Sequence, residues 1–152
     1  MEFLLRQTYY NALESFASTN NVDIIFPQTD NAQETEDNES NLIPDDFENN
    51  EIFYKCKIRS VVPDTIGIRY GLAYYKWIVQ CSIYTKAGIT ESLASYHADL
   101  LKEEFKFGAK KEASDTKYTY KFKQETNIRL ASPIKVANFV ALPCLFTVAT
   151  VR

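Results

Sequence analysis

The last apolar stretch of the chain, residues 139–151, has apolar side chains on both faces of a strand. Its sequence is FVALPCLFTVATV. Successive side chains of a strand point to opposite faces, so Val140 and Phe146 share one face while Phe139 and Leu145 share the other. A strand that is apolar on both faces has to be covered on both. This requirement limits the chain to folds with a layer on each side of its last strand.

Two segments have the spacing of amphipathic helices and can cover one of these faces. Residues 2–18 carry the first apolar stripe, which includes Leu5, Tyr9, Leu13 and Phe16. Residues 91–105 carry the second, with Thr90 as the expected N-cap; its stripe consists of Leu93, His97, Leu100, Leu101 and Phe105. The second face of the strand then needs other cover, and another subunit is an economical source.

Further strands are expected at 22–26, at 52–62, in the segment that ends at residue 84, and at 116–123, with turn residues between them. Pro143 lacks a backbone N–H, so it indicates that one edge of the last strand is locally unpaired. We therefore predict an α+β fold, which is a mostly antiparallel sheet with two helices packed on one face. At 152 residues the chain is expected to form a single domain.

Residues 28–51 form an acidic segment with nine Asp and Glu residues and no Lys or Arg. The rest of the chain carries 17 basic and 11 acidic residues. A segment with so few apolar side chains adds little to a core, so it is expected to be a flexible insertion. Three roles stay open for it: a solvated loop, a contact with basic strand faces of a neighbour, or repulsion of DNA.

Residues with catalytic or metal-binding chemistry are sparse, and no enzyme is expected. His97, the only histidine, lies on an apolar helix stripe, which favours packing over a role as a catalytic base. Cys56, Cys81 and Cys144 lack metal-site spacing and are expected to be buried free thiols in a reducing cytosol. We predict no catalytic residue, no cofactor and no metal, and no apolar run reaches the length of a membrane span.

Two expected strands alternate basic residues on one face with aromatic residues on the other. The basic positions are Lys55, Lys57, Arg59, Lys117, Lys121 and Lys123. Such a face can follow a phosphate backbone, but the stacking aromatics of a single-strand binder would lie on the opposite face. The other interpretations are a solvated face or salt bridges between subunits. We take these six residues, together with Phe139 and Leu145, as the candidate subunit or tube interface.

Residues 77–105 resemble the centre of the phage tail terminator-like (tail completion) proteins, in which a strand of the type WIVQCSIYTKAG leads to a helix of the type ESLASYHADLLKEEF. The order of the flanking segments VDIIFPQ, YKCKIRSVVP and FVALPCLFTVATVR is similar as well. The resemblance covers most of the chain except residues 28 to about 50. The acidic segment departs from the family pattern, in which this connection is often short.

The resemblance implies a virion structural protein that caps the tail tube as a ring, usually hexameric, and stops tube growth. Its implied partners are further copies of itself, the tail tube protein and the head–tail connector, with DNA only as passing cargo and no membrane. The implied location is the virion tail, and the host bacterial cytoplasm during assembly. Another connector or neck component, or a single-stranded nucleic-acid-binding protein, remains the alternative.

Overall fold

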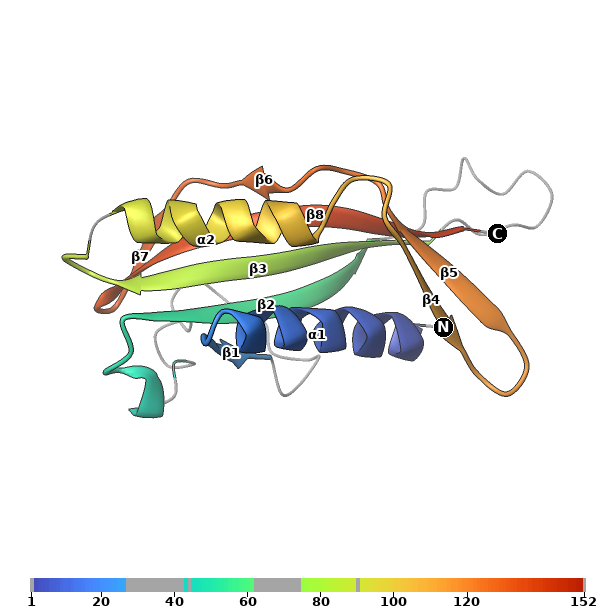
Figure 1. Cartoon of the computed structure of the whole chain (residues 1–152), viewed down its shortest axis with the longest axis horizontal. Helices are drawn as coiled ribbons and strands as arrows, with labels where there is room; N and C mark the ends of the chain where they lie inside the picture. The colour runs from blue at the N-terminus through green and yellow to red at the C-terminus, as the bar shows by residue number, and fades with distance from the viewer. Residues whose placement is uncertain (1, 27–42, 44, 62–74, 90, 152) are drawn as a thin grey trace.

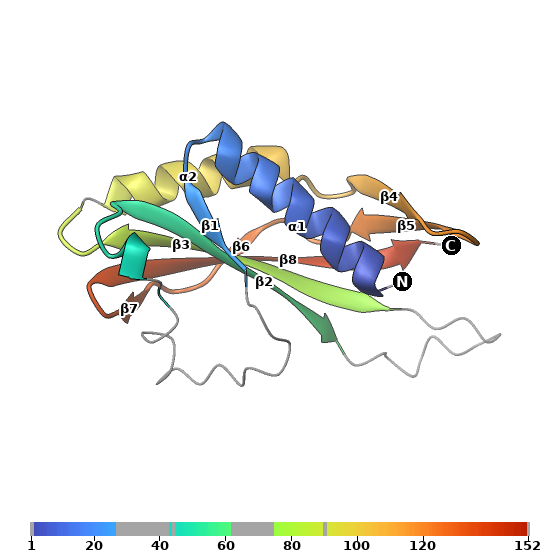
Figure 2. The ribbon, with the colours of Figure 1, turned by 90° about the horizontal axis from the view of Figure 1, so that it is seen from below.

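The computed structural model describes residues 2–26, 43, 45–61, 75–89 and 91–151. The expected N-cap Thr90, the turn at 63–71 and most of the acidic segment lie outside the described residues. Two long helices lie on the same side of a curled sheet (Figure 1; Figure 2). The fold is α+β and the sheet is mostly antiparallel, as predicted from the sequence.

The first helix, α1 (Glu2–Thr19), buries the stripe that its sequence predicts: Leu5, Tyr9, Leu13 and Phe16 are all in the core. The helix ends where Asn21 adopts a left-handed backbone conformation with φ of 55°. The N–H of Val22 donates to the carbonyl of Ala17 at 2.9 Å, and the N–H of Asn21 donates to Ser18 at 3.2 Å. This is the Schellman pattern, which satisfies carbonyls that the last turn would leave open.

The second helix, α2 (Glu91–Glu104), buries Ala94, His97, Ala98 and Leu101, and Phe105 follows in the core. The sheet has the order β1-β2-β3-β8-β5-β4, with β6 and β7 also paired to β8. Its strands are β1 (Asp23–Ile25), β2 (Ile52–Val61), β3 (Lys76–Lys86), β4 (Lys110–Ser114), β5 (Thr119–Gln124), β6 (Arg129–Leu130), β7 (Ile134–Val136) and β8 (Phe139–Val151). A 3₁₀ turn, η2 (Asp45–Phe47), precedes β2. The parallel pair β1–β2 is the exception in the antiparallel arrangement.

We name the side of the sheet that packs on α1 and α2 the helix face, and the opposite side the outer face. On the helix face, the register aligns Cys56 of β2 with Cys81 of β3, and Cys81 with Cys144 of β8. All three cysteines are free and buried, as predicted. Phe146 of β8 lies in the same cluster and stacks against Phe105 with 5.3 Å between ring centroids.

The outer face is partly covered by the chain itself. Phe53, Tyr84, Val136, Phe139 and Ala141 form a second buried cluster, against which Ile25, Ile43 and Phe47 pack. The ring of Phe47, in η2, lies 5.3 Å from that of Phe53. The expectation that Phe139 lies on a face needing cover from another subunit is therefore wrong for this end of the sheet. Two of the covering residues, Ile43 and Phe47, come from the acidic segment.

Pro143 marks an interruption in the pairing of β8, as its missing N–H predicts. One edge of β8 pairs with β3 throughout. The other pairs successively with β7 up to Ala141, with β6 from Cys144 and with β5 from Val148. The Pro143 carbonyl accepts the N–H of Ala131 at 2.9 Å, between β6 and β7. The proline thus lies where one short partner strand has ended and the next has not begun.

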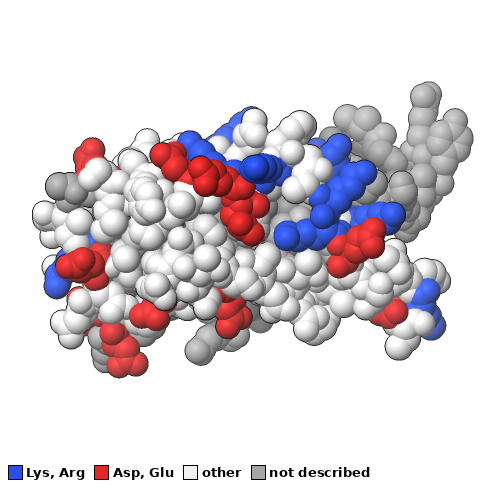
Figure 3. Space-filling model, viewed as in Figure 1, with Lys and Arg blue, Asp and Glu red and all other residues white. Residues whose placement is uncertain are grey.

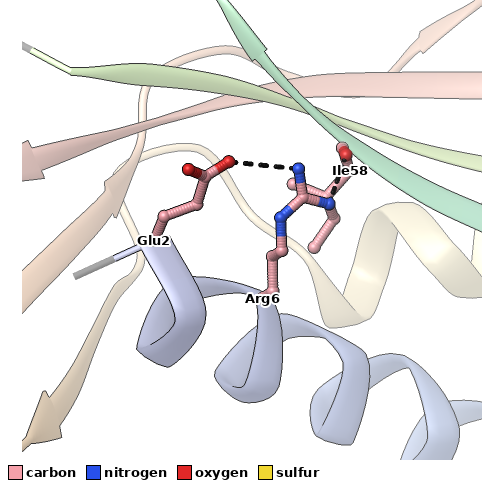
Figure 4. A network of polar contacts seen from close by, with 3 residues as sticks. All are labelled: Glu2, Arg6 and Ile58. Carbon is pink, nitrogen blue, oxygen red and sulfur yellow. Dashed lines mark hydrogen bonds and ion pairs between the residues drawn. The ribbon is translucent and has the colours of Figure 1, made fainter. Parts of the chain in front are cut away.

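The two outermost strands leave different edges free. β1 pairs only with Phe53, Tyr54 and Lys55, so beyond Lys55 no described strand pairs with this edge of β2, while its other edge pairs with β3. There the Arg6 guanidinium of α1 donates to the Ile58 carbonyl at 2.7 Å and pairs with Glu2 at 3.1 Å (Figure 4). At the opposite edge, β4 has β5 as its only partner among the described strands. One free edge is therefore capped by a helix side chain, while the other belongs to a lysine-rich hairpin.

Candidate functional site

The outer face collects seven of the eight residues predicted for the interface. Residues opposite each other on neighbouring strands share a face, and the paired positions of β2, β3, β8 and β5 connect these residues step by step. The residues on this face are Lys55, Lys57, Arg59, Lys121, Lys123, Phe139 and Leu145. The sequence pattern therefore assigned the side of each strand correctly.

The register adds basic residues that sequence reasoning did not include. Lys123 of β5 is opposite Lys110 of β4 on one side and Ala149 of β8 on the other. Ala149 is in turn opposite Lys76 of β3. Arg129 of β6 is opposite Leu145, so it lies on the same face. Long-range pairing brings these residues together, and nothing in their local sequence spacing indicates it.

We define the basic half-face as the outer-face cations outside the covered apolar end. Its members are Lys57, Arg59, Lys76, Lys110, Lys121, Lys123 and Arg129. Arg59, Lys110, Lys121 and Arg129 are exposed, and the other three are half-buried. Two carboxylates accompany them: Glu112 lies 3.4 Å from Lys121, and Glu125 lies 3.6 Å from Lys76. Burial raises the pKa of Glu125. Among the described residues, cations thus outnumber acids on this half of the face.

Lys110 and Lys123 form a like-charge pair directly across β4 and β5. At the adjacent position, the backbone carbonyl of Gln124 accepts the N–H of Gly108, and the backbone N–H of Gln124 donates to the carbonyl of Ala109, each at 2.9 Å. Because hydrogen-bonded and non-bonded pairs alternate, Lys110–Lys123 is a non-bonded pair, in which side chains come closest. Like charges in this position destabilise a sheet. The folded chain therefore contains a repulsion that a bound anion would relieve.

Three predicted interface residues lie elsewhere than expected. Lys55 is 6% exposed, so the expected solvated strand face does not extend to it, and Phe139 is 2% exposed in the second cluster. Lys117 lies in the hairpin turn between β4 and β5, outside the sheet. There the Asp115 carboxylate accepts the N–H groups of Lys117 and Tyr118, which lowers the pKa of Asp115. These positions leave Lys57, Arg59, Lys121, Lys123 and Leu145 as the predicted residues with accessible surface on the outer face.

The opposite end of the molecule is acidic. Asp46, Glu48 and Glu51 are exposed on η2 and the turn that follows it, and we name these three residues the acidic end. Lys86, at the end of β3, and Lys135, in the middle of β7, are exposed basic residues nearby. On the helix side, Figure 3 shows basic side chains gathered over the region where β4 and β5 join the body, with red side chains prevailing at the other end. Charge is therefore distributed unevenly along the long axis.

His97 lies in the core, as its place on the apolar stripe predicts. Its Nδ1 atom is hydrogen-bonded to the Tyr54 hydroxyl, and burial lowers the pKa of His97. Burial also raises the pKa of Tyr54, so that its hydroxyl stays protonated and can donate. Among the described residues, no group of His, Cys, Asp and Glu side chains is arranged to hold a metal ion. None of the described helices is both long and apolar enough to span a membrane.

Comparison with known proteins yields a likeness of fold. No family model and no curated protein sequence matches the chain. A solved structure, whose name describes no function, superposes with a TM-score of 0.71 and 11% sequence identity, and the match covers 100% of this chain and 96% of the other. At this identity the similarity concerns the fold alone, and it extends over the whole architecture described above.

Proposed function

We propose that the protein is a virion assembly protein of the tail terminator or tail completion type, which caps a phage tail tube as a ring. The observation that carries the proposal is the pair of unlike free edges on one sheet. The edge of β2 is capped by Arg6, and the edge of β4 carries lysines. Head-to-tail contacts use two different surfaces of each subunit, and they close into rings when the rotation permits.

The outer face supports the same proposal. Leu145 is half-buried beside a basic half-face that carries several exposed cations. A surface with a partly apolar centre and a charged rim is typical of protein interfaces. The ring is expected to be hexameric, as the sequence resemblance implies. Its further partners would be the tail tube protein and the connector, and DNA would pass through it as cargo.

Single-stranded nucleic-acid binding is the second candidate, and the basic half-face is the observation that favours it. The positions of the aromatic rings argue against this second candidate. Tyr54 is fully buried beneath the helices, and Tyr120 packs against the same core. These two rings therefore lie on the opposite side of the sheet from the phosphate-binding charges, and Tyr118 is exposed in the hairpin turn, outside the sheet. Another head–tail connector component remains a variant of the first proposal.

Electron microscopy of tail tubes tests the proposed function. Tubes purified from the phage or prophage that carries this chain are mixed with the protein, and their ends are imaged while tube growth is followed. We expect a ring on one end of each tube and arrested growth, and native mass spectrometry of released rings gives the copy number. A protein that stays monomeric, leaves tube ends bare and does not slow growth would rule the proposal out.

A further inference from the structure

We propose that the acidic end of one copy binds the basic half-face of the next copy. The occupant of the basic half-face is thus a second molecule of this chain. The inference deepens the proposed function and rests on it, because it names the contact that would build the ring. It is argued from the described charges of the acidic end and of the basic half-face, and from the distance that separates these two surfaces.

The two charged surfaces of a single molecule are too far apart to satisfy each other. Strand β2 runs continuously from Ile52, next to the acidic end, to Arg59 in the basic half-face. Seven steps along a strand span about 23 Å, whereas exposed charges are largely screened beyond about 8 Å in physiological salt. Asp46, Glu48 and Glu51 therefore cannot neutralise Arg59 or the β4–β5 lysines within one copy.

A second copy can bring carboxylates to the basic half-face. The acidic end is anchored rather than loose, because Phe47 lies between Asp46 and Glu48 and packs on Phe53. The basic half-face is built on strands, and its Lys110–Lys123 repulsion would be relieved by carboxylates placed between the two ammonium groups. Individual exposed pairs contribute little. Several pairs in one contact, repeated around a closed ring, set the orientation of neighbours and exclude wrong arrangements.

Complementary charge reversal is the decisive experiment. The acid-reversed variant carries Asp46→Lys, Glu48→Lys and Glu51→Lys. The base-reversed variant carries Arg59→Glu, Lys123→Glu and Arg129→Glu. A matched control carries Lys102→Glu, Lys106→Glu and Lys117→Glu, three exposed lysines outside the outer face. Self-association is measured by sedimentation velocity and native mass spectrometry at low salt, over a wide range of protein concentration.

We expect the wild type and the control to associate, and each reversed variant alone to associate at least about tenfold more weakly, because like charges then face each other. An equimolar mixture of the two variants should regain association, with the two chains alternating. The recovered particle mass distinguishes a two-subunit complex from a larger ring. Carbodiimide crosslinking of mixed ¹⁴N and ¹⁵N protein should join Glu48 or Glu51 to Lys110, Lys121 or Lys123 of another copy.

Three outcomes would overturn the inference. The first is a mixture that associates no better than its separate variants, and the second is reversed variants that associate as strongly as the wild type. The third is a wild type that neither associates nor crosslinks between copies, while base reversal abolishes binding of a fluorescent oligonucleotide. Urea unfolding of each variant confirms folding, and Gln replaces the reversed residues in any variant that fails to fold. Rings on tube ends that survive charge reversal would refute this contact but leave the proposed function standing.

Discussion

Lys110 and Lys123 face each other across β4 and β5 as a non-hydrogen-bonded pair of like charges. On the other side of β5, Ala149 separates Lys123 from Lys76. Selection for stability alone would favour an acid at one of these positions, because opposite charges across strands stabilise a sheet. The next pair along the same hairpin, Glu112 and Lys121, has that favourable arrangement. The two neighbouring pairs of one hairpin therefore have opposite effects on stability, and the like-charge pair is the one that the proposed contact between copies would relieve.

Replacing Lys123 with Glu should therefore stabilise the isolated chain while weakening its association. The free energy of unfolding in urea at low salt is expected to rise by about 0.5 kcal/mol, because repulsion becomes attraction. The gain should shrink at high salt, where exposed charges are screened. Lys117→Glu, in the hairpin turn, is the control and should change stability less. A Lys123→Glu chain that is less stable than the wild type would contradict this account.

Replacing Arg6 with Met should destabilise the fold by about 1.5–3 kcal/mol, the range for a hydrogen bond that involves a charged group. Arg6 closes the free edge of β2 by donating to the Ile58 carbonyl at 2.7 Å. Glu2→Gln removes only the exposed partner at 3.1 Å and should cost no more than about 0.5 kcal/mol. Urea unfolding of both variants makes the comparison, and equal losses would place the stabilisation in the ion pair instead.

Stability should fall as the pH is lowered through the range in which His97 titrates in the unfolded chain. Burial lowers the pKa of His97 in the folded state below its ordinary value of 6.5. The unfolded chain then binds the proton more readily, so the stabilisation is complete above pH 6.5 and declines as the pH falls toward the folded-state pKa. A protonated Nδ1 could also no longer accept the Tyr54 hydroxyl hydrogen.

His97→Gln should remove this pH dependence between about pH 7 and pH 5.5, a range in which His is the side chain that ordinarily titrates. The variant should keep its fold and its assembly with a loss of about 1 kcal/mol at neutral pH. Because the chain has a single histidine, the part of the slope of unfolding free energy against pH that disappears in this variant is assigned to His97. An unchanged slope would show that another group controls it, and loss of assembly with an intact fold would give His97 a functional role.

The three buried cysteines, Cys56, Cys81 and Cys144, should not react with alkylating reagents in the folded protein. A hydrogen bond with the Cys56 thiol, together with burial, raises the pKa of Cys81, and burial raises the pKa of Cys144 to about 12. Alkylating reagents attack the thiolate, so iodoacetamide at pH 8 should label the native chain only as fast as it unfolds. In urea all three thiols should react quickly. Mass spectrometry counts the labels, and rapid modification of any cysteine in the folded state would contradict the described burial.

The sequence predicted the helices and long strands because their apolar side chains repeat at the helical or strand period. It missed β4, since KKEAS carries a single apolar side chain, and β6 and β7, which have only two and three residues. The alternation also grouped Lys55, Lys57 and Arg59 on one face of β2, and Lys121 and Lys123 on one face of β5, as the register has them. The addition of Lys110, Lys76 and Arg129 depends on strand register, which is a long-range property that local periodicity does not contain.

The burial of Phe139 was missed for a different reason. Phe47 and Ile43 help to cover the outer face, but they occur at the end of a segment that its acidic composition marked as an insertion. Average composition conceals one or two apolar side chains, which are enough to cover the end of a sheet. The acidic segment as predicted therefore ends too late, because part of it belongs to the folded body.

Phe47 provides the last prediction, because it separates the folding role of residues 28–51 from their charge. Phe47→Ala should lower the free energy of unfolding by about 1–3 kcal/mol, less than for a fully buried Phe because the ring is half-buried. Replacing residues 30–48 with a short Gly/Ser linker should cost at least as much, since it removes Phe47 and Ile43 together. Replacing only residues 30–42 removes five acids but just two apolar residues, Ala32 and Leu42, so this composition predicts a stability near that of the wild type. If acidic charge in that stretch contributes to contacts between copies, this shorter replacement weakens association at low salt and has little effect at high salt.

Urea unfolding and sedimentation of the three variants make the comparison. Equal stability of all three would show that Phe47 does not anchor the outer face, and unchanged association of the 30–42 variant at both salt levels would confine the electrostatic contact to Asp46, Glu48 and Glu51.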